Sequence, residues 1–203
     1  MGPWEPGGRL VLILGGARSG KSDYAQRRAA ATGMPVTYVA TATAGDPDMV
    51  RRIARHRQDR PAGWATVEQP RGLGPVLRDL GGSGVIIVDC LTMLLTNVLL
   101  DGVDEPAAAT AAEADIAEFM EAARAARDAG SLVLVVSNEV GLGLVPPYPL
   151  GRLYRDVLGR ANQALTAVSD EVCLMISGIP LTIKGASGPQ PQAAGPLERH
   201  DNL

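Results

Sequence analysis

Cysteine, histidine and lysine are scarce in this sequence, and their scarcity narrows the classes of protein that it can encode. Among 203 residues there are two cysteines, two histidines and two lysines, whereas arginine occurs seventeen times. Cys90 and Cys173 both lie in apolar runs, so we expect two buried, reduced thiols rather than a disulfide. This cysteine usage is typical of a cytoplasmic protein and not of a disulfide-stapled secreted domain.

Long apolar runs and an excess of basic charge are also missing. No run reaches the length of a membrane span, and the first eight residues, MGPWEPGG, lack the basic and apolar regions of a secretory signal. The formal net charge of −3 provides no basic field for nucleic acid. We therefore expect a soluble cytoplasmic protein.

The strongest positive signal is the phosphate-binding pattern in the stretch RLVLILGGARSGKS, residues 9–22. A short apolar run ends in glycine, and residues 15–22 then match G-x-x-x-x-G-K-[ST]. The glycines allow successive backbone N–H groups to point into one concavity at a helix N-terminus, where anions bind. We expect the whole loop to hold nucleotide phosphates: Gly15, Gly16, Ala17, Arg18, Ser19, Gly20, Lys21 and Ser22.

Lysine usage supports this interpretation over that of an ordinary glycine-rich turn. Lys21 and Lys184 are the two lysines of a chain that otherwise uses arginine, so lysine stands where a compact ammonium is needed. In this pattern the lysine reaches the β- and γ-phosphates, and the hydroxyl of Ser22 is a ligand for Mg²⁺.

Apolar runs alternate with helical patterns along the rest of the chain. We expect strands at 10–14, 36–40, 64–68, 85–89, 132–136, 171–176 and 179–184, and helices at 22–31, 46–59, 73–80, 91–100, 107–129 and 152–168. This alternation predicts an α/β fold of the P-loop NTPase type: a mainly parallel sheet with helices on both faces and a C-terminal edge strand. We predict a single domain over residues 9–184, with disordered tails at 1–8 and 185–203.

One predicted helix surrounds a histidine with arginines. Asp46 is its predicted N-cap, Met49, Val50 and Ile53 form its apolar stripe, and the basic residues around His56 are Arg51, Arg52, Arg55, Arg57 and Arg60. A solvated basic helix with an incidental histidine is one interpretation. The other is a functional His56, because the arginines suit polyphosphate and favour a neutral, nucleophilic ring.

Three strand ends complete the candidate site. VIIVD, residues 85–89, has the form of a Walker B strand, in which Asp89 helps Ser22 to hold Mg²⁺. Thr41 opens a hydroxyl-rich turn after the second strand, and SNEVGLGLVPP, residues 137–147, is a loop of the kind that covers ligands. The apolar stretch 91–100 suits either a buried helix or an intersubunit surface.

Together these segments resemble the bifunctional adenosylcobinamide kinase / adenosylcobinamide-phosphate guanylyltransferase family of cobalamin biosynthesis. The resemblance covers residues 9–184 and rests on GGARSGKS (15–22), YVATA (38–42), RIARHRQDRP (52–61), VDCLTMLLTN (88–97), NEVGLGLVP (138–146) and RDVLGRANQALTAVSDEV (155–172). The phosphate loop is generic, whereas the histidine helix and the NEVGxGxVP loop are specific and occur in the family's order.

The resemblance implies a two-stage activity. Members phosphorylate the aminopropanol hydroxyl of adenosylcobinamide with ATP or GTP, and then transfer GMP from GTP to that phosphate, giving adenosyl-GDP-cobinamide and pyrophosphate. The family's nucleophile matches His56, which would attack the α-phosphorus of GTP to form a phosphoramidate, while the arginines stabilise the leaving pyrophosphate. Members form trimers, for which the apolar stretch 91–100 would be a fitting surface.

The resemblance also implies further nucleotide contacts. They match Thr41, Glu68, Asp89 and the segment Arg57, Gln58, Asp59 and Arg60. Glu68 suits the guanine N1–H and N2 amino edge, because two acceptor oxygens match two donors. Many members have glutamate in place of Asp89 and a second histidine in place of Arg55, so this chain has a shorter acid and no supporting imidazole there. Asn138 and Glu139 are candidates on the substrate side.

Three rival interpretations belong to other classes. A motor or regulatory nucleotide hydrolase needs only the phosphate loop and VIIVD, and has no use for His56. A monofunctional small-molecule kinase would have lost the transferase, against which the intact histidine argues. A non-enzymatic binding protein of the same pathway would not need the complete set of Lys21, Ser22 and Asp89.

Overall fold

The computed structural model describes residues 7–45, 47–58, 60–82, 84–101 and 104–185, except for the side chains of Asp48 and Arg52. The predicted cap Asp46 and most of both predicted tails lie outside this part of the chain. The elements in chain order are β1 (Arg9–Gly15), α1 (Lys21–Ala30), β2 (Val36–Ala40), α2 (Pro47–Gln58), β3 (Ala65–Glu68), α3 (Leu73–Leu80), β4 (Val85–Asp89), α4 (Leu91–Leu99), α5 (Glu105–Asp128), β5 (Leu132–Val136), α6 (Pro149–Val168), β6 (Glu171–Ile176) and β7 (Ile179–Lys184).

A seven-stranded sheet runs through the molecule in the order β3-β2-β4-β5-β1-β6-β7. All neighbouring strands are parallel except β6 and β7, which form an antiparallel hairpin with β7 at the edge. This arrangement confirms the predicted mainly parallel sheet and its C-terminal edge strand. The parallel strands all end at one edge of the sheet, called the carboxyl edge below, where ligands of such sheets bind.

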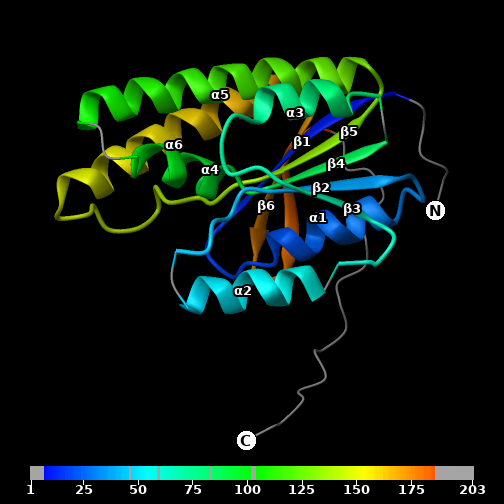
Figure 1. The fold of residues 1–203 in the computed structure, drawn as a ribbon, viewed down its shortest axis with the longest axis horizontal. Coiled ribbons are helices and arrows are strands. Elements are labelled where there is room, and N and C mark those ends of the chain that lie inside the picture. Colours follow the sequence, from blue (N-terminus) through cyan, green and yellow to red (C-terminus); the bar gives the residue numbers. More distant parts are fainter. Residues whose placement is uncertain (1–6, 46, 59, 83, 102–103, 186–203) are drawn as a thin grey trace, which may run out of the picture.

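Both faces of the sheet are covered, but unequally (Figure 1). Helices α3, α4, α5 and α6 pack on one face, and α1 packs on the other, with α2 beyond it. Successive strand residues serve opposite faces because side chains alternate along a strand: Leu10 and Leu12 join the core of the first face, whereas Val11 and Ile13 join that of the second. The continuous apolar character of β1 thus follows from its central position.

The predicted stretch 91–100 is a buried helix and not an exposed surface. Leu91, Leu94 and Leu95 of α4 have no exposed area and belong to the core under α5 and α6. Leu100, just after the helix, is exposed. The buried-helix interpretation of this stretch is therefore confirmed, and an intersubunit contact here stays a prediction that would use only its half-buried and exposed residues, such as Leu100.

Two helices begin two or three residues earlier than predicted. The start of α5 at Glu105 is fixed by Asp104, whose Oδ1 accepts a hydrogen bond from Ala107 N (2.9 Å). Helix α6 begins at Pro149, three residues before the predicted start. Proline suits the first helical position because its missing N–H has no partner there in any case.

Candidate functional site

The phosphate loop connects the carboxyl end of β1 to the N-terminus of α1. Gly15, Arg18 and Gly20 have positive φ values of 151°, 56° and 87°, so the backbone turns sharply at each of them. A Cβ at Gly15 would lie 2.6 Å from both Met175 O and Ser19 Oγ. Glycine is therefore required at this position by space as well as by conformation.

Two polar groups are buried within this loop. The ammonium of Lys21, a residue that is 7% exposed, donates to Gly16 O at 2.6 Å across the loop. Ser19 is also buried, and its Oγ has no hydrogen-bond partner among the described residues. A buried ammonium and an unsatisfied hydroxyl beside a helix N-terminus are what a phosphate group would complete.

The loop is braced from both sides by backbone hydrogen bonds that the sequence did not reveal. Gly178, in the turn between β6 and β7, donates to Ser19 O at 3.0 Å, and Glu139 N donates to Gly15 O at 3.1 Å. A Cβ at Gly20 would lie 3.3 Å from Gly178 Cα, so the two turns touch. The Ser-Gly dipeptide between two strands was a signal for a turn, but not for its contact with the loop.

A buried ion pair lies on the same side of the sheet as α1. Arg28 donates from Nη1 and Nη2 to the two carboxylate oxygens of Glu171, at 2.5 and 2.6 Å. Burial alone would lower the pKa of Arg28, but the hydrogen bonds and charge of Glu171 raise it. This pair ties α1, which carries Lys21, to the start of β6.

Asp89 ends β4 at the carboxyl edge and is held by its neighbours. The Tyr38 hydroxyl, buried in β2, donates to Asp89 Oδ2. Burial together with the Asp89 carboxylate raises the pKa of Tyr38, so this hydroxyl stays a donor. Burial and Asp89 likewise raise the pKa of Cys90 to about 11, while the charge of Lys21 opposes them. Lys21 therefore acts electrostatically on the residue next to Asp89, and the two predicted functional groups lie in one region.

Thr41 fixes the backbone beside Asp89, and its side chain is buried away from solvent. It has no exposed area, and its hydroxyl both donates to Cys90 O and accepts from Cys90 N, each at 2.7 Å. Its carbonyl accepts from Asn97 Nδ2 at 2.8 Å. The hydroxyl that the sequence suggested as a ligand contact is thus consumed in fixing the backbone beside Asp89.

The side-chain oxygen atoms of Ser22 and Asp89 are of the kind that bind Mg²⁺. Ser22 is half-buried at the start of α1, and α1 packs on β4, which ends in Asp89. Among the described residues there is no cluster of three or more histidine, cysteine or acidic side chains. One hydroxyl and one carboxylate suit an ion that completes its octahedron with phosphates and water, as Mg²⁺ does at nucleotide sites.

Three of the other predicted nucleotide contacts meet at the far end of the carboxyl edge. Arg57 forms an ion pair with Glu68, and both line a pocket of about 450 Å³ together with Arg60. The Arg60 guanidinium lies over the Tyr38 ring, 3.8 Å from its centre, and its Nε has no hydrogen-bond partner among the described residues. Through Tyr38, this pocket is connected to Asp89.

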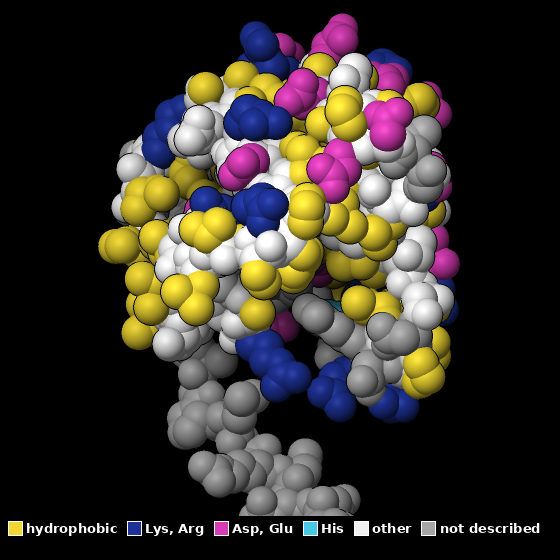
Figure 2. All heavy atoms as spheres, turned by 90° about the vertical axis from the view of Figure 1, so that its left-hand side faces the viewer, with side chains coloured by type: hydrophobic (Ala, Val, Ile, Leu, Met, Phe, Trp, Pro, Cys, Tyr) yellow, Lys and Arg dark blue, Asp and Glu magenta, His cyan; other side chains and the backbone are white. Residues whose placement is uncertain are grey.

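His56 lies on the half-buried side of α2. It follows Met49 and Ile53 at helical spacing, and these three side chains are partly covered, whereas Arg55, Arg57 and Val50 are exposed. His56 thus shares the inward stripe, from which Val50 is absent, while exposed arginines occupy the outer side. Figure 2 shows a hollow on this side of the molecule with basic side chains along its lower rim.

Gln58, at the end of α2, is exposed, and Asp59 lies outside the described residues, so both positions stay predictions. Lys184 donates to Thr166 O and Ala167 O at 2.6 and 3.0 Å, so it caps the C-terminus of α6 at the edge opposite the phosphate loop. A larger cavity of about 660 Å³, between α5 and α6, is lined by none of the predicted site residues.

Comparison with known proteins identifies the family of this chain. Residues 11–183 match the family model described as "Cobinamide kinase / cobinamide phosphate guanyltransferase". The chain is similar to the bifunctional adenosylcobalamin biosynthesis protein CobP of Pseudomonas aeruginosa, with 43% identity covering 86% of this chain and 96% of the relative. It is also similar to the proteins named CobU of Escherichia coli and Salmonella typhimurium, at 38% and 39% identity, with 86% of this chain and 99% of each relative covered.

A solved structure extends the comparison to the fold alone. The RadB recombinase superposes with a TM-score of 0.51 at 14% identity, covering 93% of this chain and 86% of that chain. The likeness agrees with the predicted P-loop NTPase-like fold. In the part of the chain that the structure describes, no helix has the length and apolarity needed to cross a membrane.

Proposed function

The chain belongs to the cobinamide kinase / cobinamide phosphate guanyltransferase family, and from this premise we propose how its residues divide the two reactions. The phosphate loop with Lys21 would serve nucleoside triphosphate in both reactions, and His56 would serve guanylyl transfer only. The substrates would be ATP or GTP, adenosylcobinamide and its phosphate, and the product adenosyl-GDP-cobinamide. The observation that carries this division is a buried, braced phosphate loop accompanied by a histidine on a separate, half-buried helix.

In the kinase reaction the loop binds the triphosphate and orients its γ-phosphorus. The Lys21 ammonium and the loop N–H groups offset the charge on the phosphate oxygens, and Ser19 Oγ is free to donate to one of them. Ser22 and Asp89 would hold Mg²⁺, which supplies further charge neutralisation when bound. The acceptor hydroxyl oxygen forms a bond to the γ-phosphorus, and the bond from that phosphorus to the bridging oxygen of the β-phosphate breaks. The nucleoside diphosphate leaves, and the hydroxyl proton passes to solvent.

In the guanylyl transfer an unprotonated imidazole nitrogen of His56 attacks the α-phosphorus of GTP. A P–N bond forms, the P–O bond to the β-phosphate breaks, and pyrophosphate leaves. A phosphate oxygen of adenosylcobinamide phosphate then attacks the same phosphorus, and the P–N bond breaks to restore the histidine. Arg60 and Arg57 line the nearby pocket and would stabilise negative charge there.

The Arg57–Glu68 pocket is the site that we propose for guanine. The Glu68 carboxylate presents two acceptors to the two donors of the guanine edge, and adenine lacks that pair of donors. Glu68 is half-exposed and paired with Arg57 on one oxygen, so a base can compete for it. This role would make the transferase specific for GTP while the phosphate loop accepts either triphosphate.

The experiment that tests the histidine is covalent labelling. The purified protein is incubated with Mg²⁺ and GTP labelled in the α-phosphate, denatured, and assayed for retained label. We expect acid-labile, alkali-stable label in the wild type and in Val50→Ala, which changes an exposed residue of the same helix outside its inward stripe, and none in His56→Ala. GTP labelled in the γ-phosphate should leave no label. Retained label in His56→Ala would refute the assignment.

We further propose a cytoplasmic enzyme in which residues 9–184 form one domain carrying both sites. For the assembly we keep the trimer that the family resemblance suggests, but with an interface that does not use the leucines of α4, because they are buried. Light scattering of the purified protein tests the trimer: a mass of three chains supports it, and a mass of one chain refutes it.

A further inference from the structure

We propose that the exposed apolar segment 141–150, which runs from the loop after β5 into the first turn of α6, is the platform that binds the corrin ring of the cobinamide substrate. This inference rests on the proposed function, since it supposes that the acceptor is a cobinamide. It assigns a place to the larger part of that substrate, which none of the residues discussed above would contact.

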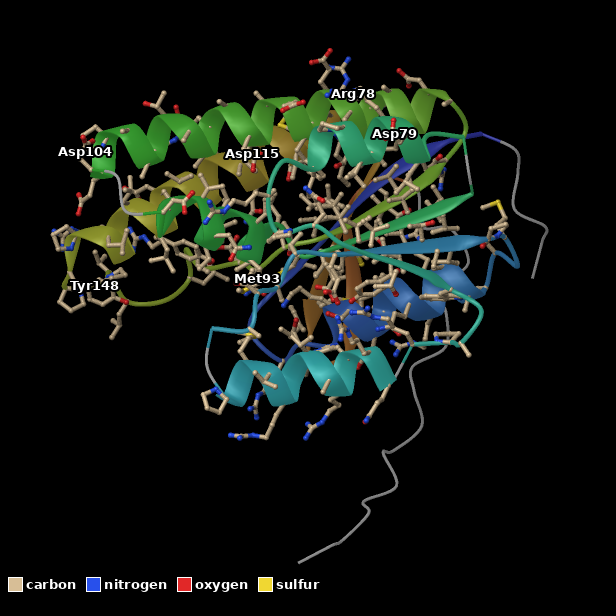
Figure 3. All side chains as sticks on the ribbon, viewed as in Figure 1. Arg78, Asp79, Met93, Asp104, Asp115 and Tyr148 are labelled. Atoms are coloured by element: carbon tan, nitrogen blue, oxygen red, sulfur yellow. The ribbon has the colours of Figure 1, made fainter. Side chains whose placement is uncertain are left out.

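The segment exposes more apolar surface than a loop normally does. Leu142 is 88% exposed and Leu144 is 96% exposed, and Val145, Tyr148 and Leu150 follow at 60%, 60% and 37%. Its sequence, GLGLVPPYPL, contains no charged residue. Figure 3 shows Tyr148 at the outer end of the segment, near the start of α6. Neighbouring exposed apolar side chains of this kind mark a binding surface rather than a chance exposure.

Polar contacts at both ends help to hold the segment in shape. Arg152 Nη1 donates to Pro147 O at 2.8 Å and to Pro146 O at 3.2 Å. At the other end, Glu139 Oε1 accepts from Gly141 N at 2.5 Å. Prolines at 146, 147 and 149 restrict the backbone further. The leucines are therefore not needed for the segment's own conformation and stay available to a ligand.

The position of the segment suits an acceptor of the phosphate loop. Its preceding residues lie against that loop, because Glu139 N donates to Gly15 O, and β5 is the strand next to β1. The reacting hydroxyl must reach the γ-phosphate in the loop, so the rest of a large acceptor must lie on an adjoining surface. Two such surfaces lie along the carboxyl edge on the β5 side of β1. The uncharged segment 141–150 follows β5, the strand next to β1, and the basic pocket of Arg57 and Arg60 lies farther along, beyond β4, at β2 and β3.

The chemistry of the two surfaces matches the two substrates. A corrin ring is a broad, flat macrocycle with methyl groups on its faces and uncharged amides around its rim. Leucine, valine and tyrosine side chains bind such faces by removing apolar area from water, and arginines would gain nothing there. A nucleotide needs the opposite surface, with cations for its phosphates.

The test compares Leu142→Ser/Leu144→Ser with the wild type and with Leu181→Ser, a control that alters an exposed leucine of β7 outside the segment. Cobinamide binding is measured directly by equilibrium dialysis, GTP binding by the same method, and molecular mass by light scattering. We expect cobinamide affinity to fall at least about tenfold in the double variant, because two leucines lose apolar area buried against the ligand. GTP affinity, mass and the Leu181→Ser control should not change.

Each other outcome overturns the platform. Unchanged cobinamide affinity would show that the leucines do not contact it, and a changed mass would show that a second copy of the chain covers the segment instead. A wild type that does not bind cobinamide also refutes the platform. If the wild type binds cobinamide in a leucine-dependent manner but transfers no phosphate to it, the platform stands and the proposed kinase function fails.

Discussion

The phosphate loop and helix α2 are the two regions to which we assign the chemistry, and they are built in opposite ways. Four residues of α1, including Lys21 and Tyr24, are buried, and backbone hydrogen bonds from two other turns brace the loop before it. Among the side chains of α2 that the structure describes, none is fully buried. The phosphate loop is therefore anchored in the core, whereas His56 lies on a helix at the periphery of the molecule.

Two ion pairs differ in burial in the same way as the two regions. Arg28 and Glu171 anchor α1 with side chains that are 13% and 2% exposed, and Arg57 and Glu68 connect α2 to β3 with side chains that are both 54% exposed. Removing one partner of a buried pair leaves an uncompensated charge, while an exposed pair is replaced by water. The comparison implies that the two reactions can be separated by mutation, and the following predictions probe it.

The largest effect is expected at Lys21. Lys21→Ala should lower both phosphoryl and guanylyl transfer by at least about 100-fold, because a buried ammonium beside the triphosphate is lost. Steady-state rates with each substrate measure this. Lys184→Ala is the matched control, since Lys184 caps α6 and should leave both rates unchanged. Equal losses in the two variants would contradict the assignment of the loop.

The buried ion pair should dominate stability. Glu171→Gln leaves the Arg28 guanidinium without its charge partner in the core, which should lower the free energy of unfolding by about 3–5 kcal/mol. Urea denaturation followed by circular dichroism gives the value. A loss below about 1 kcal/mol would mean that water reaches Arg28.

A smaller effect is expected where the two regions meet. Tyr38→Phe removes the hydroxyl that orients Asp89, so the Mg²⁺ concentration at half-maximal kinase rate should rise about tenfold, the equivalent of one charge-assisted hydrogen bond. Tyr24→Phe removes the hydroxyl of another buried tyrosine, on the same face of the sheet, and should leave the Mg²⁺ dependence unchanged. The same shift in both variants would point to a general packing effect and against orientation of Asp89.

The exposed pair should matter least for folding. Glu68→Gln should change the free energy of unfolding by no more than about 1 kcal/mol, because both side chains are half in water. Its signature should instead be a weaker preference for GTP over ATP in the labelling reaction. A large loss of stability would show that α2 depends on this pair after all.

The elements of the fold and the phosphate loop were predictable because their signals are local. An apolar strand that ends in glycine and is followed by Lys21 and Ser22 is a specific pattern. An apolar strand that ends in Asp89 is a weaker one, because buried strands often end in aspartate. Contacts between distant segments were not predictable. Nothing near Thr41 indicates that Cys90 uses its hydroxyl, and nothing near Lys184 indicates that it reaches the end of α6.

Composition alone did not predict which apolar residues are buried or how the arginines around His56 are paired. The apolar stretch at 91–100 suits a core and an interface equally, and its place under α5 depends on how distant helices pack. The arginines around His56 suggested one basic cluster. In the structure Arg57 is paired with Glu68 and Arg60 lies over Tyr38, so their charges have separate partners.

The separation of the two reactions is tested most directly by following both phosphates of GTP in His56→Ala. The variant is supplied with Mg²⁺, adenosylcobinamide and GTP labelled in either the γ- or the α-phosphate, and the corrinoid products are isolated. We predict that γ-label reaches the corrinoid at the wild-type rate while α-label never does. If both labels are lost, the histidine helix and the phosphate loop form one inseparable site. If both are transferred, His56 is not the nucleophile.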